Sequence, residues 1–160
     1  MAEIKSLNKN TICHLVVGGF LIQNKKVLLI YHPIIEKWLP VGGHIDENET
    51  PEQSLKKEFK EEVGLDIAVI NSSQKVYIAE TEIRRQAPNP FYSEIHSSGN
   101  HNHHCQFFIC KLIDERQKVK VDGIEVKEFK WFTKDELISD DQVGEDIKTV
   151  ALLALNEKKT

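Results

Sequence analysis

The chain has 160 residues, a formal net charge of -4 and 40% apolar residues, so we expect one ordinary globular domain over residues 1–160. The negative net charge argues against a protein that coats extended nucleic acid through a broad basic surface. No apolar run is long enough to span a membrane, and residues 1–10 lack the apolar core of a signal peptide, so the cytoplasm is the expected location.

Two segments rich in Val, Leu and Ile come first, at 14–22 and 26–31. Three polar residues separate them, and this spacing predicts an antiparallel hairpin. A loop is expected over 32–49, because this segment carries two prolines and two glycines. Gly18 and Gly19 interrupt the first strand, and we interpret them as a bulge or a tight contact rather than a phosphate-binding loop.

The clearest element is a helix predicted over 51–63. Thr50 is a good N-cap, and Gln53 completes a capping box with it. Pro51 suits the first helical position, and Gly64 suits the position that ends the helix. The apolar residues of the expected buried stripe recur every four positions and are Leu55, Phe59 and Val63.

The middle of the chain predicts one or two strands over 66–83, a long loop over 84–104 and a strand over 105–113. Long loops of this kind in compact domains are often functional. Cys105 and Cys110 are five positions apart in the last strand, so they should face opposite sides of the sheet and cannot pair. The cysteine count is three and no CxxC occurs, so we expect reduced thiols.

The final third predicts a strand over 125–132, a capping box over 133–136 that opens a short helix, and an amphipathic helix over 145–156. Strands and helices mix without strict alternation along the chain. An α/β sandwich, in which helices flank a mixed sheet, fits this order best.

The predicted helix 51–63 carries an unusual group of acids. Glu58, Glu61 and Glu62 share an arc of about 100° on the helix surface. Like charges at this spacing destabilise a helix, and the dipole near a helix C-terminus adds to the cost. A divalent cation would remove this repulsion, and Mg²⁺ binds a few carboxylate oxygens together with substrate phosphate oxygens. From the acids alone, a solvated acidic surface is an equal alternative.

The residues around this helix add a specific pattern. The stretch 43–65 resembles the Nudix box, G-x5-E-x7-R-E-U-x-E-E-x-G-U, where U is a bulky apolar residue. The fixed positions in register are Gly43, Glu49, Glu58, Glu61, Glu62 and Gly64. Segments 37–44 and 131–137 are similar to the family's segments before the box and near the end of the domain.

The resemblance implies an α/β/α sandwich and a divalent-metal-dependent hydrolase that cleaves a diphosphate linkage in a nucleoside diphosphate derivative. Mg²⁺ is the implied cofactor, with Mn²⁺ as a substitute. Carried over by position, the metal ligands would be Glu58, Glu61, Glu62 and the backbone carbonyl of Gly42. Glu49 would orient the helix N-terminus and the water around the metal. Glu125 and Glu128 are candidates for a further acid near the substrate.

Two positions depart from the family pattern. Lys57 stands where the family usually has Arg, so a bidentate fork is replaced by a point charge and the catalytic helix is expected to be held more loosely. Val41 stands where Pro is common before the two glycines, which removes no ligand.

Four other residues are candidates for substrate contacts. Trp38 could stack on a base or anchor its loop against the core, and both interpretations stay open. His101, His103 and His104 are expected on a loop at the pocket rim, where they would touch phosphate or sugar. With Cys105 they could instead bind zinc, although their spacing matches no common zinc module.

The partner implied by the resemblance is a small nucleotide or nucleotide sugar, and a homodimer is compatible with it. The main alternative is a nucleotide-binding or sensory Nudix domain without turnover, which only Lys57 hints at. An isopentenyl-diphosphate isomerase type ranks last, because no counterpart of its cysteine motif is present.

Overall fold

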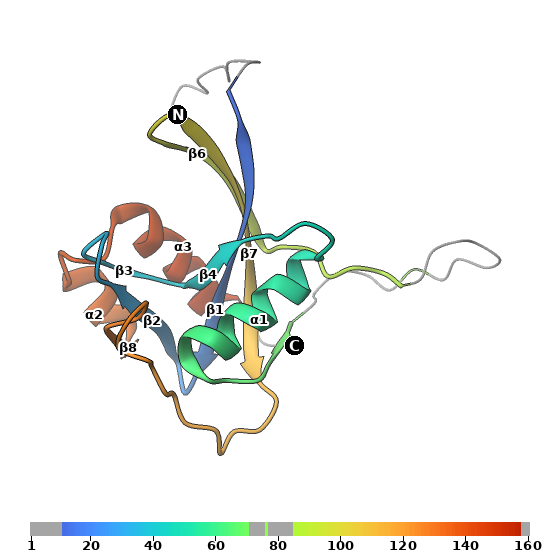
Figure 1. Ribbon diagram of the computed structural model, residues 1–160. Coiled ribbons are helices and arrows are strands. Elements are labelled where there is room, and N and C mark those ends of the chain that lie inside the picture. The colour runs from blue at the N-terminus through green and yellow to red at the C-terminus, as the bar shows by residue number, and fades with distance from the viewer. Residues whose placement is uncertain (1–10, 71–75, 77–84, 158–160) are drawn as a thin grey trace.

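The computed structural model describes residues 11–70, 76 and 85–157. The strands are β1 Cys13–Gln23, β2 Lys26–His32, β3 Lys37–Leu39, β4 Val41–His44, β5 Ile67–Val69, β6 Tyr92–Ser98, β7 His101–Leu112 and β8 Glu128–Phe132. The helices are α1 Pro51–Val63, α2 Lys134–Ser139 and α3 Glu145–Asn156 (Figure 1).

The sheet is mixed and is organised around β1 and β7. These two strands pair in parallel from Cys13 opposite Asn102 to Leu21 opposite Cys110. The free edge of β1 is shared by β4 and β2, both antiparallel to it. The free edge of β7 is shared by β6 and β5, also antiparallel. β2 extends the sheet further through β3 and β8.

Two apolar cores lie on opposite faces of the sheet, one under each helical layer (Figure 1). On one face α1 buries its predicted stripe, Leu55, Phe59 and Val63. On the other face α3 buries Ile147, Val150, Ala151 and Ala154. The predicted α/β/α sandwich with a mixed sheet is therefore confirmed.

The predicted ends of α1 are confirmed atom by atom. The Gln53 N–H donates to Oγ1 of Thr50 across 3.2 Å, and the Thr50 N–H donates to Oε1 of Gln53 across 2.9 Å. Gly64 ends the helix with φ of 68°, a left-handed conformation that favours glycine. These contacts fix where the acidic face of α1 begins and ends.

Gly18 and Gly19 of β1 both make tight contacts, which was one of the two interpretations of this pair, the other being a bulge. A Cβ on Gly18 would lie 2.7 Å from Phe107, and a Cβ on Gly19 would lie 2.5 Å from Phe59. Cys105 and Cys110 belong to different cores, which confirms that they face opposite sides of the sheet.

Several predicted boundaries were wrong. The expected loop 84–104 contains the whole of β6, and β7 begins at His101 instead of residue 105. These strands extend beyond the core, so polar side chains occupy both faces and the period-2 apolar signal is missing. The expected loop 32–49 likewise contains β3 and β4.

The remaining differences are smaller. β8 begins at Glu128, three residues later than predicted, and β5 covers only Ile67–Val69 of the segment 66–83. The second strand allowed for in that segment falls mainly outside the described residues. Within the described part of the chain, no helix combines the length and apolar character needed to cross a membrane.

Candidate active site

Two glutamates of α1 approach the glycine pair of β4. The Gly42 N–H donates a hydrogen bond to Oε2 of Glu62 across 3.2 Å. A Cβ on Gly43 would lie only 2.6 Å from Oε1 of Glu58. A Cβ on Gly42 would overlap the backbone carbonyl of Val17, whereas a Cβ on Gly43 would meet the movable end of the Glu58 side chain. The Gly-Gly pair of β4 and the acids of α1 therefore pack closely as one structural unit.

The two carboxylates are withdrawn from water to different degrees. Glu62 is 9% exposed, and burial raises its pKa to about 8, against the opposing effect of the Gly42 hydrogen bond. Burial, with a smaller effect of the nearby Glu61 charge, also raises the pKa of Glu58. Glu61 itself is exposed. Like charges at such spacing shift protons onto the carboxylates unless a cation is present.

The donor set fits a divalent metal. In the described part of the chain, the ion pairs of basic side chains go to other acids, and Glu58, Glu61 and Glu62 take part in none of them. Carboxylates that form no ion pair with a basic side chain are oxygen ligands of the kind that Mg²⁺ and Mn²⁺ favour. The residues that would hold such an ion are these three glutamates.

Lys57 directly precedes Glu58 on α1 and is held by two acids. Its Nζ lies 3.1 and 3.2 Å from the two carboxylate oxygens of Glu49 and also contacts Asp46. Oε2 of Glu49 accepts a further hydrogen bond from Oγ of Ser54 across 2.6 Å. Glu49 therefore has two partners on α1, and Lys replaces Arg here without losing contact with both oxygens.

The acids after the box take different positions. Glu125 is close enough for its charge to raise the pKa of both Glu58 and Glu62. Asp122 also raises the pKa of Glu62, and sequence reasoning did not select it because it lies outside any motif. Glu128 is exposed in β8, opposite Tyr31. Of the two predicted acids, Glu125 is the one whose charge reaches the glutamates of α1.

A pocket of about 460 Å³ adjoins this unit. Gly42 and Gly43 line it on one side, and Val16, Cys105 and Phe107 contribute apolar side chains. The β2–β3 turn, the β6 strand and the first residues of α3 complete its walls. The glycine pair is thus shared between the pocket and the carboxylates of α1.

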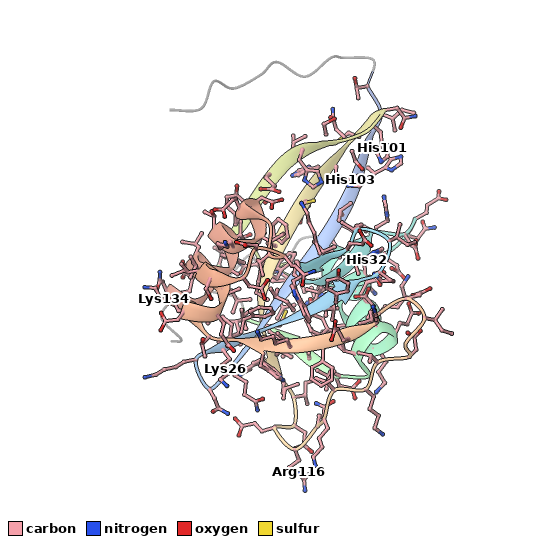
Figure 2. All side chains as sticks on the ribbon, turned by 90° about the vertical axis from the view of Figure 1, so that its left-hand side faces the viewer. Lys26, His32, His101, His103, Arg116 and Lys134 are labelled. Carbon is pink, nitrogen blue, oxygen red and sulfur yellow. The ribbon has the colours of Figure 1, made fainter. Side chains whose placement is uncertain are left out.

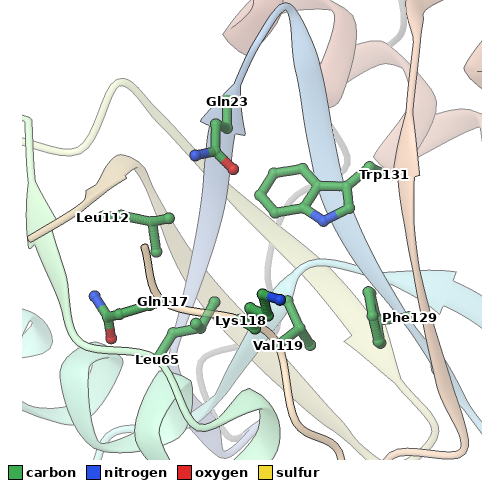
Figure 3. Close-up of a pocket in the computed structure, with 8 residues that line it drawn as sticks. All are labelled: Gln23, Leu65, Leu112, Gln117, Lys118, Val119, Phe129 and Trp131. Carbon is green, nitrogen blue, oxygen red and sulfur yellow. The ribbon is translucent and has the colours of Figure 1, made fainter. Parts of the chain in front are cut away.

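A second pocket, of about 350 Å³, lies beside the C-terminal ends of β1 and β7 (Figure 3). Leu65, Leu112 and Trp131 are among its lining residues, together with Gln23 and Gln117 (Figure 3). Its lining contains no carboxylate and no histidine. It therefore lacks the groups that diphosphate chemistry needs.

Trp38 belongs to the core. It is 6% exposed, and its ring packs edge-on against Tyr31 at 5.3 Å and Phe132 at 5.2 Å. The buried ring leaves little surface for a nucleobase, so the anchoring interpretation is favoured over base stacking.

The three predicted histidines divide between the two faces of β7. His101 and His103 share one face with Cys105, whereas His104 alternates to the other face, where Leu15 and Ile95 are its neighbours in register. Figure 2 shows His101 and His103 together near one end of the long strands, with Arg116 at the opposite end of the molecule. Only His103 of the three lines the larger pocket.

Known proteins match this chain in sequence and in fold. Residues 13–153 match the NUDIX domain. A curated relative, an 8-oxo-dGTP diphosphatase of Proteus vulgaris, is 33% identical over 58 residues, which are 34% of this chain and 52% of the relative. The chain thus spans about half the length of this relative.

Solved structures are similar over nearly the whole chain. A NUDIX family hydrolase from Clostridium perfringens has a TM-score of 0.74 and 28% identity, covering 94% of this chain and 98% of that one. An ADP-ribose pyrophosphatase from Streptococcus suis has the same fold, with a TM-score of 0.57 and 19% identity over 91% of this chain and 94% of that one. With the domain match over most of its length, the chain belongs to the Nudix family.

Proposed function

We propose that this protein hydrolyses a diphosphate linkage in a nucleoside diphosphate derivative and that it needs Mg²⁺ or Mn²⁺ to do so. The observation that carries the proposal is the shared position of Gly42 and Gly43. They line the larger pocket and at the same time contact Glu62 and Glu58. A substrate that extends from the pocket past the glycine pair would bring its diphosphate to the carboxylates on the other face of β4.

The roles of the residues follow from their exposure. Glu58, Glu61 and Glu62 would hold the divalent ion, which when bound supplies neutralisation of the diphosphate charge and polarisation of water. Glu61 is the exposed member of the three, and we assign it the role of the base that accepts the proton of the attacking water. Lys57 fixes Glu49, and Glu49 fixes the first turn of α1 through Ser54. The apolar pocket walls would keep the base and sugar in place.

The names of similar proteins support this substrate class. One relative is described as an 8-oxo-dGTP diphosphatase, and proteins of the same fold are described as a UDP-X diphosphatase and an ADP-ribose pyrophosphatase. All three names refer to hydrolysis of a nucleotide diphosphate bond. We therefore propose this bond as the reactive group and leave the attached moiety open.

The test is a substrate panel with matched variants. The wild type, Glu62→Gln and Glu52→Gln are assayed with Mg²⁺ or Mn²⁺ on 8-oxo-dGTP, ADP-ribose and a UDP-sugar, and the release of nucleoside monophosphate is measured. Glu52 is a good control, since it lies on the same helix but pairs with Lys56 and Arg85. We expect kcat to fall about a hundredfold or more in Glu62→Gln, because a bound metal lowers the barrier by several kcal/mol.

Two outcomes would contradict the proposal in different ways. Full activity of Glu62→Gln on a substrate that the wild type turns over would exclude the carboxylate mechanism. Binding of a nucleotide by the wild type without turnover of any panel member would favour the non-catalytic alternative.

A further inference from the structure

Four histidines from three strands meet at one end of the sheet, and we call them the imidazole cluster. Its members are His14 in β1, His44 in β4, and His101 and His103 in β7. One ring nitrogen of each lies within 4.8 Å of those of the other three. His44 and His103 also line the larger pocket, but the proposed hydrolysis gives none of the four a catalytic or metal-binding role.

Strand register explains why the cluster forms. His14 and His103 are directly opposite each other in the parallel β1–β7 pair. His44 is opposite Val16 in the β1–β4 pair, and Val16 lies on the same face of β1 as His14, two residues away. His101 lies on the same face of β7 as His103, for the same reason. The rings are therefore placed by backbone pairing and not by a loop.

The imidazole cluster is distinct from the carboxylate site. His44 follows Gly43 in β4, so its side chain points to the face opposite the one on which a Cβ of Gly43 would meet Glu58. The two groups thus occupy opposite faces of one short strand. Figure 2 shows His101 and His103 away from the helical layers, toward the end of the long strands.

The rings are arranged as electron-pair donors. Oδ1 of Asn100 lies 3.0 Å from Nδ1 of His101 and can accept its N–H, which leaves the lone pair on Nε2. That Nε2 lies 2.9 Å from Nε2 of His103, so without a metal it accepts a hydrogen bond from the His103 ring. A cation between the two nitrogens would replace this hydrogen bond, and the proton of His103 would move to its Nδ1. Burial and the neighbouring imidazoles lower the pKa of His103, which favours its neutral form. Neutral imidazole is the form that binds metals.

The imidazole cluster is less suited to binding an anion than to binding a cation. Four protonated rings at this separation would repel one another strongly. Among the described residues, the one His–carboxylate pair is formed by His96 and Glu94, outside the cluster. A cation between the rings would be attracted by all four lone pairs, whereas an anion would need the rings to turn their N–H groups inward or to gain protons.

We propose that the imidazole cluster is a structural site for a divalent transition ion, with Zn²⁺ as the ion that best fits four imidazole ligands. Tetrahedral Zn²⁺ with Zn–N bonds of about 2.0–2.1 Å places its ligand nitrogens about 3.3–3.4 Å apart. This separation lies between the 2.9 Å and 4.8 Å found in the cluster. His14 and His44 are exposed, so their rings can rotate into place.

The role follows from the ligand count. A catalytic zinc keeps a coordination position open, whereas four protein ligands close the site. The bound ion would tie together the N-terminal part of β1, the end of β4 and the β6–β7 hairpin. These strands carry part of the wall of the larger pocket, including His44 and His103.

The experiment measures metal binding to the full chain, independently of hydrolysis. Chelator-treated protein is titrated with Zn²⁺ in excess Mg²⁺, which occupies oxygen sites and competes weakly for imidazole. Calorimetry gives the affinity, elemental analysis gives the stoichiometry, and Co²⁺ in place of Zn²⁺ gives the visible spectrum of a tetrahedral site. We expect one tightly bound ion per chain and a rise in Tm on binding.

Matched variants identify the ligands. His14→Gln and His44→Gln replace exposed ligands, so the fold is retained, and each should weaken Zn²⁺ binding by about a hundredfold or more. His104→Gln is the control, because it changes the same segment on the opposite face and should bind Zn²⁺ as the wild type does. A Glu58→Gln/Glu62→Gln double variant should also bind one Zn²⁺, which separates this site from the carboxylates.

Three results would overturn the proposal. One is a wild type that takes up no Zn²⁺ in the presence of Mg²⁺. Another is His14→Gln and His44→Gln proteins that keep the wild-type affinity. The third is loss of the tight Zn²⁺ in the Glu58→Gln/Glu62→Gln variant, which would assign the ion to the carboxylates. None of these results depends on whether the protein hydrolyses nucleotides.

Discussion

The Gly42 N–H donates a hydrogen bond to Oε2 of Glu62 across 3.2 Å and so joins β4 to the last turn of α1. Glu62 is almost fully buried at this contact. The carboxylate is thereby held against the glycine pair that lines the larger pocket. This contact connects the stability of the protein to its proposed chemistry.

The stability of the metal-free protein should depend on Glu62. Burial raises the pKa of Glu62 to about 8 in the folded state, whereas an unfolded chain has a glutamate pKa of about 4.3. Between these pH values the folded state holds a proton that the unfolded state releases, so the free energy of unfolding falls as pH rises and levels off above about pH 8. Glu62→Gln removes this dependence.

Thermal unfolding with a chelator present, at several pH values from 5 to 9, measures the effect. The Tm of Glu62→Gln should exceed that of the wild type increasingly across this range, by about 3 °C or more at the upper end. Addition of Mg²⁺ should reduce the difference, because the ion stabilises the charged carboxylate. A difference that stays constant with pH would show that the carboxyl group is not withdrawn from water.

The two glycines of β4 should respond differently to an added methyl group. In Gly43→Ala the new Cβ meets the end of the Glu58 side chain, which can move aside. We therefore expect a folded protein whose kcat is reduced by about tenfold or more, because the displaced carboxylate no longer fits the metal. In Gly42→Ala the Cβ would overlap the Val17 backbone carbonyl, which cannot move.

Circular dichroism and a kinetic assay on both alanine variants separate these effects. Gly42→Ala should lose several degrees of Tm or fail to fold, since its clash is with backbone. Equal losses of stability in the two variants would contradict the assigned contact between Gly43 and Glu58.

Lys57 should act by positioning Glu49. Its Nζ contacts both oxygens of Glu49. Lys57→Ala is expected to lower kcat by about 10-fold to 100-fold, as loss of outer-shell partners does at metal sites, and to leave KM less affected. Lys57→Arg should restore the rate, because a guanidinium can also pair with both oxygens.

Lys56→Ala is the matched control, since Lys56 is the preceding residue on the same helix and pairs with Glu52 away from the site. It should keep the wild-type kcat. If Lys57→Ala kept it too, the contact with Glu49 would have no role in turnover.

Trp38 should matter for stability rather than for nucleotide affinity. Its ring is buried between Tyr31 and Phe132. Trp38→Ala should lower the free energy of unfolding by about 3–5 kcal/mol, and Trp38→Phe should lower it by less, because part of the ring volume is kept. Urea unfolding gives these values. A Trp38→Phe protein with unchanged stability but much weaker nucleotide binding would support base stacking instead.

Some features were decided by local sequence. The ends of α1 could be predicted because Thr50, Gln53 and Gly64 make contacts within a few residues of one another. The placement of Glu58, Glu61 and Glu62 on one side of the helix follows from helical periodicity alone. These signals do not depend on the rest of the fold, so the helix and its acids were available from the sequence.

Other features were decided only by tertiary structure. β6 and the first part of β7 have no buried face to produce an apolar pattern, so their strand character comes from pairing with distant segments. The parallel register of β1 and β7 places His14 opposite His103, and β4 adds His44. The burial of Glu62 against Gly42 likewise depends on how α1 packs on the sheet. Strand register and helix packing depend on the whole core. For that reason, local patterns in a single sequence could not predict that these residues lie close together.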